Sequence, residues 1–143
     1  MIKRYIIKNS IDLANPILGT KIVSCSDEFF APAKRILNPL PPIFKENVFD
    51  NHGKWMDGWE TRRRRSKGND YLLIKLGKPG KIKLAEVDTS FFNGNQPEYV
   101  QIEGCFSENN NIKHIKWIKI TKKIKIKPNY KNCLLYTSDA ADE

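Results

Sequence analysis

The sequence predicts an all-β domain of the sandwich type. Several short segments carry the period-two alternation or the β-branched and aromatic residues of strands, turn residues separate them, and hardly any stretch has helical periodicity. The 143 residues suffice for one domain with a sizeable core and are too few for two domains of ordinary size. We therefore expect a single domain of packed strands.

The first part of the chain is predicted to hold short elements joined by turns. Residues 2–8 have a strand pattern, and residues 11–14 predict a helical turn confined by a following proline and glycine. Residues 21–24 return to strand character. Residues 38–44 read N-P-L-P-P-I-F, and this proline content excludes a regular ladder and predicts an extended surface loop.

Strand patterns follow one another from residue 66 onward. After a turn at 66–70, residues 71–76 form an apolar run typical of a buried strand. A loop over 77–80 leads to the alternating segment 81–92, and we expect these two segments to form an antiparallel pair. Residues 99–105 predict one further strand.

The most regular alternation lies at residues 118–127, where isoleucine occupies the even positions 118, 120, 124 and 126 and lysine or threonine occupies the odd ones. This pattern predicts a strand with one buried and one exposed face. A solvent-exposed lysine face also protects an edge strand from pairing with other chains. Nucleic-acid binding is the alternative reading of the same face.

The chain is basic, with 25 Lys and Arg against 16 Asp and Glu, a formal net charge of +9 and a pI near 9.5. Such a charge favours anionic partners through long-range attraction, which includes nucleic acid, membrane surfaces and small anions. Much of the excess comes from lysines that alternate with isoleucine, and an AT-rich coding sequence produces the same composition. The net charge therefore does not select among these partners.

The three cysteines, Cys25, Cys105 and Cys133, form an odd set without C-x-x-C spacing. This pattern excludes a disulfide framework and a cysteine zinc site, and it fits a reducing compartment. No apolar run approaches the roughly 20 residues that cross a bilayer, and the N-terminus lacks the apolar region of a signal peptide. We expect a soluble, cytoplasmic protein that does not bind membranes.

The densest group of functional side chains lies at residues 53–65, G-K-W-M-D-G-W-E-T-R-R-R-R. On a strand, the first and third arginines of the run 62–65 would share one side, and the second and fourth would share the other. One pair must then point inward or into a cleft, where a guanidinium needs a partner. Asp57 and Glu60 are near enough in sequence to serve, and an anionic ligand is the alternative.

Two tryptophans, Trp55 and Trp59, flank Gly58 in this block. Their spacing suits a loop that lines a pocket with rigid aromatic walls, and burial in the core is the alternative for each of them.

Other stretches carry groups that suit a site. Asp27 and Glu28 are adjacent and form either a surface acidic pair or site carboxylates, whose mutual repulsion would raise one pKa unless a cation neutralises them. His52, in a turn, is a candidate base by residue type. Asp88 and Thr89 are either turn formers at a strand end or groups that face a ligand.

The last eleven residues, 133–143, change composition abruptly and become small and acidic. They are similar to translated adapter or linker sequence. We therefore expect a native domain over 1–132 and a tail of non-native appearance that begins at Cys133.

Four stretches together resemble the allantoicase family in order and spacing. The likeness covers residues 11 to 130 or so, and its motifs lie at 26–33, 53–65, 76–82 and 87–95. The resemblance implies hydrolysis of allantoate to ureidoglycolate and urea in purine and allantoin degradation. It also implies two related jelly-roll β-sandwich repeats of the galactose-binding-domain-like type, of which this chain matches the first, and an oligomeric intact enzyme.

The chain departs from the family in two respects. It lacks the further strand with an I-Y-P-D-G-G-like turn that completes the first repeat, and it lacks the second repeat. The resemblance therefore implies a fragment whose sandwich is incomplete at its C-terminal end and exposes an unpaired edge.

Allantoate presents one carboxylate and two ureido groups, so its site needs a cationic fork, polar groups for the amides and a proton donor for the departing nitrogen. Carboxyl groups that could protonate urea or activate water are Asp27, Glu28, Asp57, Glu60 and Asp88. Side chains that could bind the substrate are Lys54, Trp55, Trp59, Arg62, Arg63, Arg64, Arg65 and Thr89. The sequence establishes no cofactor with certainty, and a divalent metal held by some of these carboxylates and His52 is an open alternative. Two alternatives stay open, a non-catalytic ligand-binding sandwich and a basic nucleic-acid module, and nucleic acid is not our expected partner.

Overall fold

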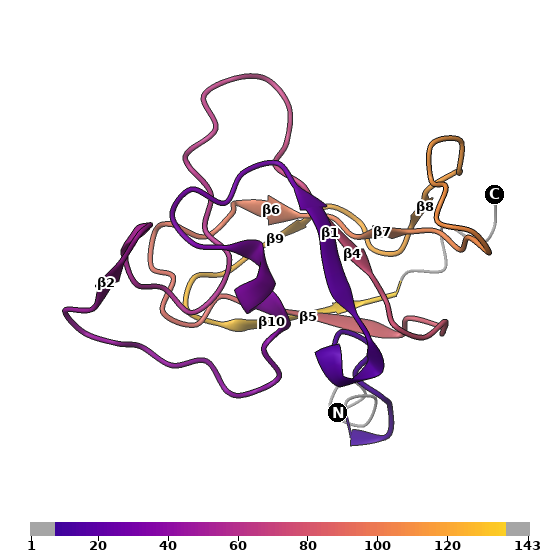
Figure 1. Ribbon diagram of the computed structural model, residues 1–143, viewed down its shortest axis with the longest axis horizontal. Coiled ribbons are helices and arrows are strands. Elements are labelled where there is room, and N and C mark those ends of the chain that lie inside the picture. The colour runs from indigo at the N-terminus through magenta and orange to yellow at the C-terminus, as the bar shows by residue number, and fades with distance from the viewer. Residues whose placement is uncertain (1–7, 137–143) are drawn as a thin grey trace. The chain divides into compact units, whose positions relative to one another are not determined.

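The structure, a computed structural model, describes residues 8–136 almost entirely as short strands and loops (Figure 1). The all-β prediction is confirmed, while the strand predicted over residues 2–8 falls almost wholly outside the described residues. The chain divides into two compact units. We call Asp12–Lys78 the N-terminal unit, and Pro79–Glu143 with Met1–Ile11 the C-terminal unit. Two such units can belong to one domain, so the predicted single domain stays a prediction.

In the N-terminal unit, β1 (Lys21–Cys25) pairs antiparallel with β4 (Leu72–Lys75), and the two strands lie side by side in Figure 1. Both strand predictions are confirmed. β4 is only half-buried, whereas its apolar run predicted a buried strand. The 3₁₀ helix η2 (Ala33–Leu37) contacts β1 and buries its first and last residues.

The helical turn predicted over 11–14 instead lies at η1 (Pro16–Leu18), a 3₁₀ helix. The side chain of Asn15 accepts a hydrogen bond from the main-chain nitrogen of Ile17 at 3.0 Å and caps this helix. Proline has no N–H group, so it costs nothing at a first helical position, where that group would have no partner within the helix. The proline thus begins the turn rather than ending it.

A short hairpin precedes the arginines. β2 (Phe49–Asp50) pairs antiparallel with β3 (Gly53–Lys54), and residues 51–52 form the predicted turn between them. Gly53 has a φ of 111°, a backbone conformation that residues other than glycine rarely adopt. Beyond the hairpin the chain is irregular, except where Ala31 and Glu60 form an isolated antiparallel bridge.

In the C-terminal unit, β5 (Leu84–Asp88) pairs antiparallel with β10 (Lys131–Leu135). The predicted pairing of residues 71–76 with 81–92 is therefore wrong, because each segment pairs with a strand distant in sequence. The chain leaving β4 does not reverse at once. It is held at Gly77, whose main-chain nitrogen donates a hydrogen bond to the Thr20 hydroxyl at 2.9 Å.

The strand predicted over 99–105 is broken into β6 (Tyr99–Val100) and β7 (Glu103–Gly104). These pair with β9 (Ile124–Lys125) and β8 (Ile118–Lys119), respectively. At the break, the main-chain nitrogen of Ile102 donates to the hydroxyl of Thr121 at 3.1 Å. A side chain here takes the place of a main-chain partner, so the ladder stops and restarts.

The isoleucine and lysine alternation agrees in part with the structure. Ile120 and Ile126 are buried, and the lysines at the odd positions are exposed, as expected. Ile118 is an exception with 52% of its surface exposed.

The predicted tail boundary at Cys133 falls inside β10, where Leu134 is 2% exposed. The first residues of that tail therefore belong to a paired strand. Residues 137–143 lie outside the described residues, and the origin of the tail stays a prediction.

Candidate functional site

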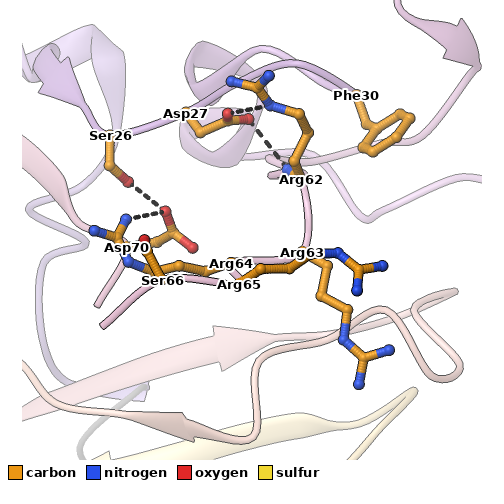
Figure 2. Close-up of a pocket in the computed structure, with 9 residues that line it drawn as sticks. All are labelled: Ser26, Asp27, Phe30, Arg62, Arg63, Arg64, Arg65, Ser66 and Asp70. Atoms are coloured by element: carbon orange, nitrogen blue, oxygen red, sulfur yellow. Dashed lines mark hydrogen bonds and ion pairs between the residues drawn. The ribbon is translucent and has the colours of Figure 1, made fainter. Parts of the chain in front are cut away.

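The arginine run, Arg62–Arg65, lines an open cavity of about 650 Å³ in the N-terminal unit (Figure 2). The segment that follows β1 forms the other wall. The bridge between Ala31 and Glu60 holds the two segments together, with N–O distances of 3.1 Å and 3.3 Å in its two directions. The complete lining is Ser26, Asp27, Phe30, Arg62, Arg63, Arg64, Arg65, Ser66 and Asp70.

Arg62 is paired with Asp27. Its Nε donates to Asp27 Oδ2 at 2.7 Å, and its main-chain nitrogen donates to Oδ1 at 3.1 Å. The main-chain nitrogen of Phe29 also donates to Oδ1, at 2.9 Å. These hydrogen bonds, first that from Phe29 and then those from Arg62, lower the pKa of Asp27. Asp27 is therefore an anion at neutral pH and is not suited to protonate a leaving group.

Arg64 is paired with Asp70, its Nη1 lying 3.4 Å from Asp70 Oδ1. The same carboxylate oxygen accepts a hydrogen bond from the Ser26 hydroxyl at 2.8 Å. The main-chain nitrogen of Tyr71 in turn donates to Ser26 Oγ at 2.9 Å. Asp70 thus joins the start of β4 to the end of β1 and fixes the direction of Arg64.

Arg63 and Arg65 have no carboxylate partner among residues 8–136. Figure 2 shows their side chains pointing away from Asp70, with no interaction to the residues drawn. The run is not a strand, but its side chains still alternate in direction as an extended chain predicts, with the first and third arginines on one side and the second and fourth on the other. One pair is neutralised and the other is not.

The structure differs from the predicted pairing in two ways. All four arginines are exposed, and in the first ion pair the carboxylate is the more buried side chain, since the side chain of Asp27 is 13% and that of Arg62 63% exposed. The carboxylates that bind the run are Asp27 and Asp70, and the predicted partner Asp57 forms no ion pair among those found in the described part of the chain. A long guanidinium can stay hydrated at its tip while it bonds to a carboxylate at its base, so burial of the cation is not required.

The other carboxylates of the N-terminal unit serve the backbone. Glu28 accepts a hydrogen bond from the main-chain nitrogen of Ala33 at 2.9 Å, at the start of η2. Asp57 accepts one from the main-chain nitrogen of Ile43 at 2.8 Å and thereby ties down the proline-rich loop. Neither carboxylate lines the cavity. Glu60 contributes its main chain to the bridge beside it.

The tryptophans and Lys54 lie outside the cavity lining. Trp55 is half-buried between two cations, with Arg35 Cζ at 5.4 Å and Lys45 Nζ at 4.5 Å from its ring centroid. Trp59 is also half-buried, and its Nε1 donates to the main-chain oxygen of Asp27 at 2.6 Å. Lys54 Nζ lies 5.4 Å from the centroid of a phenylalanine ring. Their roles as substrate contacts stay predictions.

His52 occupies the turn between β2 and β3. Its Nδ1 lies 2.9 Å from the main-chain oxygen of Phe29, and its main-chain nitrogen donates to Asp50 Oδ1 at 2.8 Å. Among residues 8–136, no group of three or more His, Cys, Asp and Glu side chains could hold a metal ion. The alternative of a metal held by His52 and the carboxylates therefore finds no ligand set in this part of the chain.

Asp88 and Thr89 belong to the C-terminal unit, where both have local partners. Asp88 Oδ1 accepts hydrogen bonds from the main-chain nitrogen and the hydroxyl of Ser90. Thr89 is 4% exposed, and its hydroxyl lies 2.7 Å and 3.0 Å from the main-chain oxygens of Lys127 and Tyr130. These contacts agree with the turn-forming alternative, and the roles of both residues at a substrate site stay predictions.

Sequence reasoning missed four residues of the cavity lining: Ser26, Phe30, Ser66 and Asp70. Asp70 stands at the end of a predicted turn, six residues after Arg64, and this placement was the available signal for an ion pair across the turn. Nothing in the sequence brings Ser26 to Asp70, because the pairing of β1 with β4 creates that contact.

The comparisons with known proteins agree on one family. The family model "Allantoicase: Allantoicase repeat" matches residues 11–142. A "Probable allantoicase" of Acinetobacter baumannii strain SDF is 42% identical over 135 residues, which cover 94% of this chain and 40% of that protein. A "Probable allantoicase" of Acinetobacter baylyi is 53% identical over 106 residues, which cover 74% of this chain and 32% of that protein.

Two solved structures are also similar. "Structure of allantoicase" has a TM-score of 0.72 and 32% identity, over 94% of this chain and 41% of that one. The crystal structure of allantoicase from Saccharomyces cerevisiae has a TM-score of 0.72 and 32% identity, over 96% of this chain and 42% of that one. The A. baumannii relative and both solved structures match 94–96% of this chain. The chain spans about two fifths of the length of each of them.

Proposed function

We propose, because this chain belongs to the allantoicase family, that the full-length protein hydrolyses allantoate to ureidoglycolate and urea. The observation that most strongly supports binding of this substrate is the arrangement of the four arginines. The cavity has two neutralised arginines and two arginines without a carboxylate partner among the residues that the structure describes. This arrangement suits the binding of a small anion.

Arg63 and Arg65 receive the carboxylate of allantoate in this proposal. Each guanidinium offers several N–H groups in a planar fork that matches the two oxygens of a carboxylate. Asp27 and Asp70 neutralise Arg62 and Arg64, which restricts the free positive charge of the run to the two arginines on the other side. The substrate therefore meets two cations that are not neutralised, on a segment that the other two arginines anchor.

The reaction adds the oxygen of water to the carbon that carries the two ureido groups, and the bond from that carbon to one ureido nitrogen breaks. The proton taken from water is balanced by a proton delivered to the departing nitrogen, so urea leaves neutral. The carboxylate does not change, and Arg63 and Arg65 hold substrate and product alike. They are expected to lower KM more than they raise kcat.

The family also supports finer proposals about architecture and setting. We propose a jelly-roll sandwich of the galactose-binding-domain-like type, a homo-oligomer, and no nucleic-acid partner. Cys25 and Cys105 are free thiols, which supports the proposal of a reducing cytoplasmic setting. No helix among the described residues is long and apolar enough to span a membrane.

The test is urea release from allantoate by the full-length protein. Steady release of one urea for each ureidoglycolate supports the proposal. Binding of allantoate without urea would identify a non-catalytic ligand-binding domain. Affinity for nucleic acid that falls steeply with salt, without urea release, would identify the basic module instead.

A further inference from the structure

His52 is linked to the arginine run through a continuous series of hydrogen bonds. A carbonyl oxygen can only accept, so the contact between His52 Nδ1 and the Phe29 oxygen at 2.9 Å places the proton on Nδ1. The main-chain nitrogen of Phe29 donates to Asp27, which binds Arg62. The Phe29 ring also lies against Arg62, with Cζ 5.1 Å from its centroid. Both polar main-chain groups of Phe29 are therefore held.

The other end of the series is equally fixed. His52 donates its main-chain N–H to Asp50 Oδ1, and Asp50 Oδ2 pairs with Arg35 Nη2 at 2.7 Å. Arg35 also donates from Nη1 to the main-chain oxygen of Met56 at 3.0 Å. The hairpin turn that carries His52 is thus anchored to η2, which contacts β1.

We propose that His52 is a positioning residue for the carboxylate-binding arginines, acting through Phe29 and Asp27. This inference rests on the proposed function. The imidazole does not line the cavity, so it does not touch the substrate in this account. It fixes the peptide of Phe29, which sets the position of the Asp27 carboxylate and of Arg62. Arg63 follows Arg62 directly, so a shift of Arg62 moves one half of the substrate fork.

Protonation of His52 does not break this contact, because Nδ1 carries a proton in the neutral tautomer drawn here and in the imidazolium form alike. Asp50, which binds the main chain of His52, is neutralised by Arg35. Asp27 and Glu28 directly precede Phe29, and they bind Arg62 and the start of η2, respectively. The proposed role therefore adds no acidic or basic limb to the pH profile of kcat.

Two substitutions separate this role from proton transfer. In His52→Asn, the amide nitrogen occupies nearly the place of Nδ1 and can still donate to the Phe29 oxygen, whereas the basic ring nitrogen is gone. In His52→Leu, both are lost. Since loss of a positioning hydrogen bond weakens binding by roughly 0.5–1.5 kcal/mol, we expect His52→Leu to raise KM about 2- to 12-fold at nearly unchanged kcat. His52→Asn should remain near the wild-type KM.

The matched control is His114→Leu, in the C-terminal unit, which should leave KM and kcat unchanged. A double substitution with Arg63→Met provides a second control. If His52 acts through the arginine run, His52→Leu should add little to the effect of Arg63→Met.

A measurement without substrate keeps the inference independent of the proposed activity. The main-chain N–H of Arg62 is bonded to Asp27, so its hydrogen exchange should quicken in His52→Leu and not in His52→Asn. Absence of urea release by the wild-type protein would end the proposed function and leave this exchange result intact. If exchange and KM stay at wild-type values in His52→Leu, the positioning role is wrong. It is equally wrong if both His52 variants lose kcat to the same extent, because that result assigns proton transfer to the ring.

Discussion

Asp27 binds Arg62 twice, through Oδ2 to the guanidinium Nε at 2.7 Å and through Oδ1 to the main-chain nitrogen at 3.1 Å. A single carboxylate thus fixes both the backbone and the side chain at the first position of the arginine run. The ion pair neutralises Arg62. Because it also fixes the main chain of Arg62, it positions the main chain of Arg63, the next residue.

The first prediction concerns acid stability. The pKa of Asp27 is lowered in the folded protein by the N–H of Phe29 and by Arg62. The stabilisation is present above the unfolded-state pKa of about 3.9 and is lost as the pH falls through the lower, folded-state pKa. Unfolding of the wild type by urea at pH 7, 5, 4 and 3 should therefore show a decline toward acid pH that is shallower in Asp27→Asn. Parallel curves for the two proteins would contradict the assignment.

The second prediction separates structure from substrate binding at Thr89. Thr89→Val leaves the main-chain oxygens of Lys127 and Tyr130 without the hydroxyl, and loss of such buried partners costs about 1–3 kcal/mol. We expect a lower free energy of unfolding and an unchanged KM for allantoate, measured where both proteins are folded. A raised KM at wild-type stability would restore Thr89 to the substrate site.

Asn132 provides the matching control in the same buried cluster. Its Nδ2 lies 3.4 Å from Thr89 Oγ1 and donates to three main-chain oxygens. Asn132→Ala should destabilise by a similar amount, and the two substitutions together should cost less than the sum, because they remove one shared network.

The third prediction compares two glycines. A Cβ at Gly77 would lie 1.9 Å from the main-chain oxygen of Leu18, and moving the backbone to relieve this clash would cost stability. A Cβ at Gly104 would lie 2.6 Å from Ile120 Cδ1, the end of a flexible side chain. Gly77→Ala should therefore lower the thermal unfolding midpoint clearly more than Gly104→Ala, as measured by circular dichroism. Equal shifts would mean that the approach of Gly77 to Leu18 is not a constraint.

Local patterns predicted those features of the fold that depend on neighbouring residues. The strand at β1, the strand at β4 and the turn at His52 follow from alternation and turn residues, and all are present. Pairing could not be predicted in the same way. β5 lies opposite β10, more than forty residues away along the chain, and a side-chain hydroxyl of Thr121 breaks one predicted strand.

In the candidate site, too, local features could be predicted and contacts between distant residues could not. The arginine run was recognisable as a group that needs anionic partners, and its alternating directions followed from an extended chain. The identity of the partners did not follow, since Asp27 lies 35 residues from Arg62 and meets it through the bridge of Ala31 with Glu60. Proximity in sequence favoured Asp57 as the partner, but Asp57 instead accepts a hydrogen bond from the proline-rich loop, residues 38–44.

The most direct test of the account is the kinetics of Arg63→Met combined with Arg65→Met in the full-length protein. Loss of charged hydrogen bonds to a carboxylate, about 1.5–3 kcal/mol each, predicts a KM for allantoate raised about 10- to 150-fold for each arginine removed, with little change in kcat. Lys119→Met with Lys125→Met removes the same charge from the exposed faces of β8 and β9 and should leave KM unchanged. An unchanged KM in the arginine variant, or an equal rise in the lysine control, would contradict the claim that these two guanidiniums bind the substrate carboxylate.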